Sequence, residues 1–330
     1  MRILIAGSIQ GDSGYEEEFI IKNMVNYLNN AGHVVDSFML PYKRDMLSLP
    51  DQILAYQMID TSIADMLITV GYPACTLRHK NKIVYVLEMS PMLHEYWDSE
   101  YGVIANAQYS RIYETINNLE RQVLSDAKKI VCNSQLLCDD IARIYSLQAI
   151  LGYYPNVFDV YDNNLSQDKT YYICETSLMP HQRIELLLDV VKVMGCAKWL
   201  LYVPKSDLVY METLKMQIEE RKINENIIVC NDIIPDNVIK SAIAYFAPEY
   251  NVRKIPASVT RCVSLGTPVI TCEDSGAVSE YVTVYKFGYV EKKSLSNIVK
   301  KLQHVENEGK SKITMKLPDM ESFMRGLLTL

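Results

Sequence analysis

Apolar residues along this chain follow two alternating patterns, short continuous runs and longer segments with helical spacing. Residues 3–7 form a continuous apolar run of the kind found in buried parallel strands. The spacing of Ile20, Met24 and Leu28 then places three apolar side chains on one face of a helix that ends before Gly32. Further strand-like runs in the first half are residues 33–35, 66–70, 82–87 and 129–132.

The same alternation restarts after Tyr154-Pro155-Asn156, which we interpret as a hinge. Strands are predicted at 171–174, 199–203, 226–230, 244–247 and 268–271, with helices at 181–193 and 208–222. Strands that alternate with helices imply right-handed βαβ units and doubly wound sheets. The pattern therefore predicts an α/β protein of two Rossmann-like halves, with a ligand cleft between them at the carboxyl ends of the strands.

The composition narrows the class of protein. With 330 residues, 49% hydrophobic and 22% charged, the chain is globular rather than disordered. Lys and Arg number 33 and Asp and Glu 40, so the net charge of 33 − 40 = −7 disfavours a general nucleic-acid coat. We therefore expect no nucleic-acid partner, and any basic site must be local.

The cysteines and the hydropathy pattern bear on location and metal content. The eight cysteines include no Cys-x-x-Cys pair and no zinc-like pattern with histidines, so we expect buried reduced thiols and no metal. No window approaches 18 apolar residues, and the apolar start is too short for a signal peptide. The protein is predicted to be cytoplasmic, with at most peripheral membrane association.

One segment carries a family resemblance. Residues 264–276, Ser-Leu-Gly-Thr-Pro-Val-Ile-Thr-Cys-Glu-Asp-Ser-Gly, resemble the helix–strand–loop of the donor site in retaining glycosyltransferases of family four, which have the GT-B fold. Residues 11–18 are similar to the family's N-terminal glycine loop and helix, Asn133-Ser134 to the start of a helix that faces the other domain, and residues 179–183 to its donor-phosphate loop. These matches occur in the family's order and span most of the chain.

The resemblance implies GT-B architecture, in which two facing Rossmann-like domains enclose an interdomain cleft. Residues 1–156 would form an acceptor-side domain and residues 157–317 a donor-side domain. Residues 318–330 resemble the C-terminal helix that crosses back to the first domain, and residues 292–316 are predicted to be a solvated helix and linker. A nucleotide-sugar would be the co-substrate, with no other cofactor.

The chain departs from the family where the donor binds. The family's two glutamates, one contacting the donor sugar and the other the nucleotide ribose, would stand at positions occupied here by Arg253 and Arg261. The family's phosphate-binding Arg and Lys would fall at Ser177 and Gln182. In place of an expected Gly-x-Gly turn, residues 203–206 read Val-Pro-Lys-Ser.

Arginines are the first candidates for a rebuilt donor site. Because a guanidinium binds phosphate oxygens in bidentate fashion, Arg253, Arg261 and the neighbouring Arg183 are predicted to take over the contacts to the diphosphate. The alternative is a solvated helix start whose arginines pair with an acid such as Glu249 or Glu273. The helix macrodipole mildly disfavours cations at a helix start, so in either case they should meet an anion.

Four further donor-side candidates stand at predicted turns and helix starts. Ser275 and Gly276 are predicted to present backbone amides to a phosphate, or else Ser275 is simply an N-cap. Gly14, in the turn at 11–14, admits the same two interpretations, without a full dinucleotide fingerprint. His181 is a donor-site residue by family position, or a capped surface histidine.

Two acceptor-side candidates follow the strand at 82–87. Glu88 is predicted to face the cleft and to orient or deprotonate an acceptor hydroxyl, unless it is a strand-end acid paired with Arg78 or Lys80. His94, beside Glu95, Tyr96 and Trp97, is predicted to line an acceptor pocket, the alternative being an ordinary buried aromatic helix.

Two functions remain open at this point. The first is an active glycosyltransferase that moves a sugar from a nucleotide-sugar to an unknown acceptor through a remodelled donor site. The second is a catalytically inactive homologue that binds or stabilises an active partner glycosyltransferase. The replaced family positions favour it, because removing even the first of several groups that act as one unit costs orders of magnitude in rate.

Overall fold

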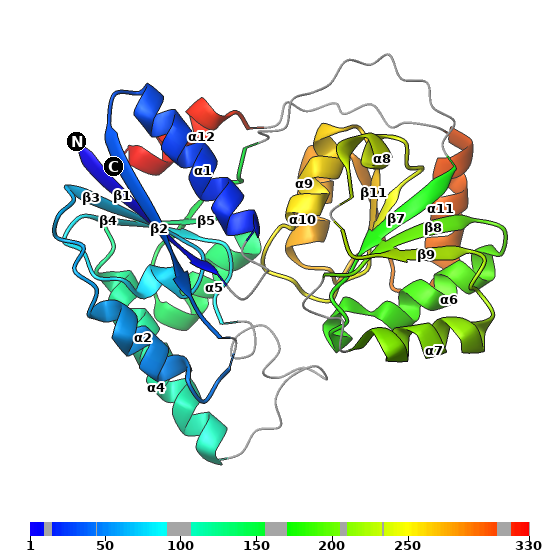
Figure 1. Ribbon diagram of the computed structural model, residues 1–330, viewed down its shortest axis with the longest axis horizontal. Helices are drawn as coiled ribbons and strands as arrows, with labels where there is room; N and C mark the ends of the chain where they lie inside the picture. The colour runs from blue at the N-terminus through cyan, green and yellow to red at the C-terminus, as the bar shows by residue number, and fades with distance from the viewer. Residues whose placement is uncertain are drawn as a thin grey trace. The chain divides into compact units, whose positions relative to one another are not determined.

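The computed structural model describes residues 1–9, 15–43, 45–90, 107–155, 170–204, 210–232, 234–308 and 318–329. The chain forms two compact units, Met1–Val157 with Pro318–Leu330, and Phe158–Leu317 (Figure 1). Each unit is built on a parallel sheet of six strands. Several sequence predictions lie outside the described residues: the turn at 11–14, the segment around His94, Asn156 of the hinge, residues 205–206 and the linker at 309–317.

The first sheet has the strand order β2-β1-β3-β4-β5-β6. Its strands are β1 (Arg2–Ile9), β2 (Val34–Pro41), β3 (Met66–Val70), β4 (Lys82–Val86), β5 (Lys129–Cys132) and β6 (Ile150–Leu151). In the parallel register, Ile5 of β1 lies opposite Ser37 of β2 and Ile68 of β3. All five residues of β4 are buried, which is why this strand is an apolar run rather than an alternating one.

Helices cover both faces of the first sheet. They are α1 (Tyr15–Asn30), α2 (Leu49–Gln57), the short 3-10 turn η1 (Ala74–Thr76), α4 (Ala107–Ser125) and α5 (Gln135–Tyr145). Ile20, Met24 and Leu28 of α1 are buried against the strand residues Ile3 and Ile5, as their spacing predicts. On the other face, α4 and α5 pack in a second cluster with β4 and β5.

The C-terminal helix α12 (Met320–Leu328) belongs to the first unit and lies beside α1 (Figure 1). The side chain of Asp319 caps its first turn by accepting from the amide of Ser322 at 2.7 Å. The ring of Phe323 is 6% exposed and lies 5.1 Å from the Tyr85 ring and 5.6 Å from the Tyr154 ring, centroid to centroid. The end of the chain therefore completes the core around β1, β3 and β4.

The second sheet has the strand order β12-β11-β10-β7-β8-β9. Its strands are β7 (Tyr171–Glu175), β8 (Lys198–Tyr202), β9 (Ile227–Cys230), β10 (Tyr245–Ala247), β11 (Val269–Cys272) and β12 (Gly288–Glu291). From β7 the chain adds β8 and β9 on one side of the sheet. It then adds β10, β11 and β12 on the other side of β7, so the direction of winding reverses between β7 and β10. Tyr245 of β10 pairs with Ile173 of β7 at this point.

Helices and 3-10 turns connect these strands. They are η2 (Pro180–Gln182), α6 (Ile184–Met194), α7 (Met211–Arg221), α8 (Asp236–Lys240), α9 (Ala257–Ser264), α10 (Ala277–Tyr285) and α11 (Leu295–Glu308). The core of this unit centres on Trp199, which stacks on Tyr172 at 4.8 Å between ring centroids and meets Phe246 edge-on at 6.3 Å.

Two sequence predictions are corrected here, and two strands are added. The helix predicted to be solvated after residue 292 is α11, and it buries Ile298, Leu302 and Val305 in the core of the second unit. The two-residue β6 and the edge strand β12 were not predicted. Six of the eight cysteines are buried, but Cys196 is exposed and Cys230 is half-buried.

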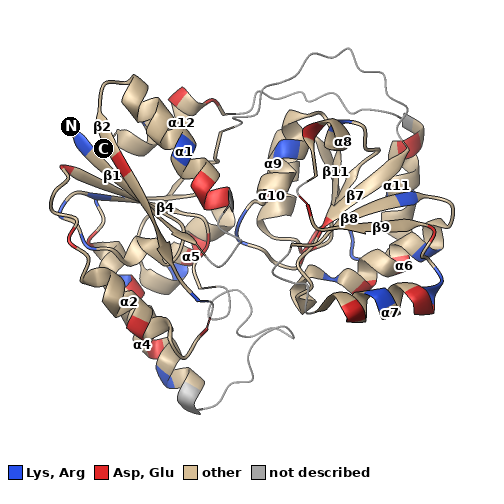
Figure 2. Ribbon diagram, viewed as in Figure 1, with Lys and Arg blue, Asp and Glu red and all other residues tan. Residues whose placement is uncertain are grey.

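Charged residues of both signs lie side by side on the outer helices, for example on α6 and α7 (Figure 2). There Arg221 bridges the two helices by donating to Asp189 at 3.0 Å and to Glu185 at 2.8 Å. Among the described helices, none is long and apolar enough to cross a membrane. The described residues also contain no group of three or more His, Cys, Asp or Glu placed to hold a metal ion.

Candidate functional site

The most promising place for a ligand in the second unit follows from its strand order. In doubly wound sheets, ligands bind outside the carboxyl ends of the strands, where the order reverses. Here the reversal lies between β7 and β10, and the segments leaving β7, β10 and β11 meet there. We call residues 175–183, 248–253 and 273–277 the β7–β11 edge.

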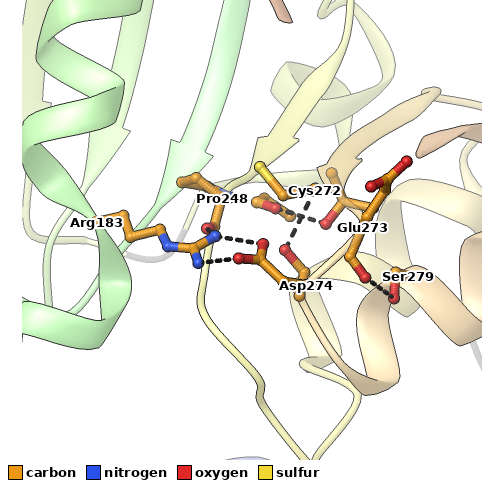
Figure 3. Close-up of polar contacts among 9 residues, drawn as sticks. Arg183, Pro248, Cys272, Glu273, Asp274 and Ser279 are labelled. Carbon is orange, nitrogen blue, oxygen red and sulfur yellow. Dashed lines mark hydrogen bonds and ion pairs between the residues drawn. The ribbon is translucent and has the colours of Figure 1, made fainter. Parts of the chain in front are cut away.

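Arg183 lies at the centre of this edge, between η2 and α6. Its side chain is 4% exposed, and its guanidinium donates to Oδ1 of Asp274 through Nη1 at 2.7 Å and to Oδ2 through Nη2 (Figure 3). Nη1 also donates to the carbonyl of Pro248 at 3.1 Å, and the guanidinium carbon lies 4.9 Å from the centroid of the Tyr250 ring. Arg183 thus ties the β10 and β11 loops to the start of α6.

Electrostatics agree with this geometry. Partial burial acts to raise the pKa of Asp274, but the hydrogen bond and charge of Arg183 outweigh it and hold the pKa below its usual value. Asp274 is therefore ionised at neutral pH and neutralises the guanidinium. The residue predicted to contact a diphosphate is already bound to a protein carboxylate.

Arg261, on α9, is also bound to an acid. Its Nε donates to Oδ1 of Asp236 at 3.1 Å, and its Nη2 donates to the Ile234 carbonyl at 2.8 Å. Asp236 begins α8, so the acid partner observed is neither Glu249 nor Glu273, the two acids proposed from the sequence. The interpretation of Arg261 as an ion-paired cation fits the contacts, with a different partner.

Arg253 precedes α9 and is 8% exposed. Its Nη1 donates to the carbonyl of Asn251 at 3.0 Å and to the side-chain oxygen of the same residue. Asn251 has a φ of 52°, a left-handed conformation that asparagine tolerates better than most residues. Hydrogen bonds to the backbone and side chain of Asn251 therefore fix the Arg253 guanidinium against the turn that precedes it.

Ser275 does not cap α10, contrary to the simpler interpretation of this residue. The helix begins at Ala277 with Gly276 as its N-cap. The fully buried Ser275 hydroxyl instead accepts from the amide of Cys272 at 3.3 Å, and the Ser275 amide donates to the Cys272 carbonyl at 3.0 Å. Ser275 closes the turn that leaves β11.

Of the two amides predicted to bind an anion, that of Ser275 is already used in this turn, and neighbouring amides also bond to the protein. The Ala277 amide donates to the Val252 carbonyl at 2.7 Å, and the Asn251 amide donates to the Asp274 carbonyl at 2.7 Å. Gly276 has a φ of 64°, and a Cβ there would lie 2.2 Å from the Val252 carbonyl oxygen. Only glycine permits this close approach of the two loops.

The remaining predicted site residues are divided between the two units. His181, in η2, accepts from the Tyr250 amide through its carbonyl at 2.8 Å, so its backbone belongs to the β7–β11 edge. Glu88 is half-buried two residues beyond β4, at the carboxyl end of the first sheet. His94 and Gly14 lie outside the described residues.

Two glutamates at the edge were not predicted to be site residues: Glu175 was not considered, and Glu249 was named only as a possible partner of the arginines. Glu249 is 3% exposed, and burial raises its pKa to about 7, with the charge of Glu175 acting in the same direction and Arg183 against it. Burial likewise raises the pKa of Glu175. Glu175 is the last residue of β7 and Glu249 lies two residues beyond β10, and acids at the carboxyl ends of strands were the signal that could have found them.

By sequence, this chain matches no family model and no curated protein. Solved structures do match. WaaG, a glycosyltransferase involved in lipopolysaccharide biosynthesis, has a TM-score of 0.65 and 11% identity over 93% of this chain and 91% of WaaG.

Two further solved structures were bound to ligands. HepE from Anabaena, in complex with UDP and glucose, gives a TM-score of 0.66 and 12% identity over 93% of this chain and 90% of HepE. A variant of TarM from S. aureus, in complex with fondaparinux, alpha-GlcNAc-glycerol and UDP, gives 0.56 and 15% identity over 78% of this chain. The match covers 52% of TarM, so it spans about half of that protein.

These likenesses establish the fold. The protein has the GT-B, Rossmann-like α/β fold of glycosyltransferases, with two parallel six-stranded sheets and interspersed helices. The fold class predicted from the sequence is confirmed. At identities of 11–15%, the comparisons describe architecture rather than activity.

Proposed function

We propose that this is a glycosyltransferase-like protein that transfers a sugar from a nucleotide-sugar to an acceptor, through a donor site remodelled from that of retaining family four. The observation that carries the proposal is the β7–β11 edge. It places the Arg183 guanidinium, the Asp274 carboxylate and the buried Glu249 at the reversal of strand order in a GT-B fold. The UDP-bound HepE and TarM structures support a nucleotide ligand.

Each unit has its own part in the proposal. The donor binds to the unit of residues 157–317, with Arg183, Arg253, Arg261, His181, Ser275 and Gly276 as donor-binding candidates. The acceptor binds to the unit of residues 1–156, where Glu88 orients or deprotonates its hydroxyl and His94 lines its pocket, and Gly14 is a further donor-binding candidate. Catalysis then rests on positioning the two substrates and on stabilising the leaving diphosphate.

A second candidate function has a specific observation in its favour. Arg183 and Arg261 each donate to a protein carboxylate, so a diphosphate must displace Asp274 or Asp236 to gain either cation. Ion pairs of this kind are stable without ligand. They favour a catalytically inactive homologue that binds or stabilises an active partner glycosyltransferase.

Calorimetric titration separates the two functions. UDP-glucose, GDP-mannose and ADP-glucose are titrated into the full-length protein and into the Arg253→Ala and Arg261→Ala variants. Binding of one donor that weakens at least tenfold in both variants supports the transferase. Arg325→Ala is the control, because Arg325 pairs with Glu321 on the exposed face of α12.

Absence of binding by every donor at millimolar concentration would reject the transferase and leave the subunit function. That function is then tested by co-purification with a GT-B glycosyltransferase whose two motif glutamates are intact. A donor that binds is next tested for release of its nucleoside diphosphate in the presence of sugar acceptors, with Glu88→Gln expected to slow release without weakening donor binding.

A further inference from the structure

Glu249 stands out among the buried acids of the second unit. It lies two residues beyond β10 at the reversal of strand order, and it is 3% exposed. Its Oε2 atom has no hydrogen-bond partner among the described residues. A buried carboxylate oxygen without a donor is costly when it is ionised, so the protonated form is favoured.

The ionisable groups around Glu249 belong to four neighbouring segments. The titratable groups that act on it are Glu175 and Cys174 of β7, Arg183 before α6, Tyr245 of β10 and Cys272 of β11. Burial raises the pKa of Cys174, Tyr245 and Cys272 well away from neutrality, to about 11 for Cys272, so these three are neutral near pH 7. Arg183 is the permanently charged neighbour that remains, and Glu175 is the other acid of the group, with a pKa that burial also raises.

Counting these charges shows what ionisation of Glu249 does. The single positive charge of Arg183 is already taken by Asp274 in a bidentate pair. With Glu249 protonated, Arg183, Asp274 and Glu249 together are neutral, and any charge on Glu175 adds equally to both states of Glu249. With Glu249 ionised, the net charge of these three residues is −1, in surroundings where water screens charge poorly.

We propose that Glu249 determines the charge of the ligand that the β7–β11 edge accepts: a phosphate-bearing donor binds when the Glu249 carboxyl is protonated and is repelled when it is ionised. This inference rests on the proposed function, because it takes the donor to be a nucleoside diphosphate sugar. Glu249 acts through its charge alone, since its carboxyl is buried. Donor binding is therefore coupled to uptake of a proton.

The test is donor affinity as a function of pH. UDP-glucose is the probe, because its diphosphate carries the same charge near pH 6 and near pH 8. The wild-type protein is expected to bind about tenfold more tightly near pH 6, the effect of one charge several ångströms away in partly buried surroundings. The isosteric Glu249→Gln variant is expected to bind equally at both pH values, with the higher affinity.

The matched control is Glu273→Gln, which removes an exposed carboxylate from the loop after β11. It should keep the tenfold ratio between the two pH values. A second measurement needs no variant: calorimetry near pH 7 in two buffers of different ionisation enthalpy should show proton uptake when wild-type protein binds UDP-glucose.

The outcomes separate the two proposals. UDP-glucose binding of equal strength near pH 6 and pH 8, without proton uptake, overturns the role of Glu249 and leaves the proposed function standing. If neither wild-type protein nor Glu249→Gln binds UDP-glucose, GDP-mannose or ADP-glucose at either pH, the transferase function fails, and the role of Glu249 in donor binding fails with it.

Discussion

Arg183 and Asp274, 91 residues apart in sequence, are joined by two parallel hydrogen bonds at the carboxyl ends of the second sheet. The pair links the start of α6 to the loop between β11 and α10. Arg183 adopts a left-handed conformation, with a φ of 54°, which costs about 1 kcal/mol for a residue other than glycine. The contacts of its guanidinium offset that cost.

Replacing Arg183 with alanine should therefore destabilise the second unit. Arg183→Ala leaves the half-buried carboxylate of Asp274 without its partner, and we expect a loss of about 2–3 kcal/mol in the free energy of unfolding, measured by urea titration. Arg143→Ala is the control: that arginine is 64% exposed in its ion pair with Asp140 and should contribute less than about 1 kcal/mol. Equal losses would contradict the role given to Arg183.

The raised pKa of Glu249 predicts a pH-dependent stability. Its pKa is about 7 in the folded protein against 4.5 for a glutamate exposed to water, so between these values the folded state holds a proton that the unfolded state has released. Stability therefore falls as pH rises from about 4.5 to about 7, by roughly 2–3 kcal/mol. Urea titrations near pH 5 and pH 8 should show this loss, and Glu249→Gln should remove most of it. An unchanged slope in the variant would show that other groups are responsible.

Gly276 and Gly266 offer a matched pair of substitutions. Both have positive φ, 64° and 73°, but a Cβ at Gly276 meets the Val252 carbonyl whereas a Cβ at Gly266 meets nothing within 4 Å. Gly266→Ala should cost about 1 kcal/mol, from backbone conformation alone. Gly276→Ala should cost at least about 3 kcal/mol, because the 251–252 loop must also move away. Thermal unfolding of the two variants checks the difference.

Lys82 is a buried cation whose role is structural. It is 1% exposed, and its Nζ donates to the carbonyls of Cys75 at 3.2 Å, Leu77 at 3.0 Å and Val123 at 2.6 Å. Lys82→Met leaves these carbonyls without a donor and should destabilise the first unit by about 3 kcal/mol. The exposed Lys80→Met is the control, with an expected change within about 0.5 kcal/mol. A small effect for both would mean that water replaces the ammonium.

Phe323 tests the contribution of the C-terminal helix to the first unit. Its ring fills the space between Tyr85 and Tyr154, so Phe323→Ala should cost about 3–4 kcal/mol through loss of burial and the cavity that remains. The exposed Glu321→Ala, on the same helix, should cost less than about 1 kcal/mol. Unfolding of both variants by urea provides the comparison, and a stable Phe323→Ala would show that α12 is dispensable.

The strands were predictable because buried parallel strands are continuous apolar runs. The run at 66–70 coincides with β3, and the run at 129–132 coincides with β5. β12 (Gly288–Glu291) was missed because it is a half-buried edge strand without such a run. The lysines of α11 suggested a solvated helix, and its buried stripe of Ile298, Leu302 and Val305 was overlooked.

The residue types of the candidate site were visible in the sequence, but their partners were not. A cation at the start of this helix was expected to meet an anion, but Arg261 lies in the last turn of α9. Nothing local indicates that Asp236 binds Arg261 across 25 residues, or that Asp274 binds Arg183 across 91. The importance of Glu249 depends on burial at the strand reversal, which is a property of the sheet order.

Periodicity and backbone propensity act over a few residues, which is why the α/β class and most strands of this protein are written in its local sequence. Ion pairs, burial and the acidity of a carboxyl depend on which distant segments the fold brings together. The pairing of Arg183 with Asp274 and the buried state of Glu249 were therefore decided only when β7, β10 and β11 assembled into one sheet.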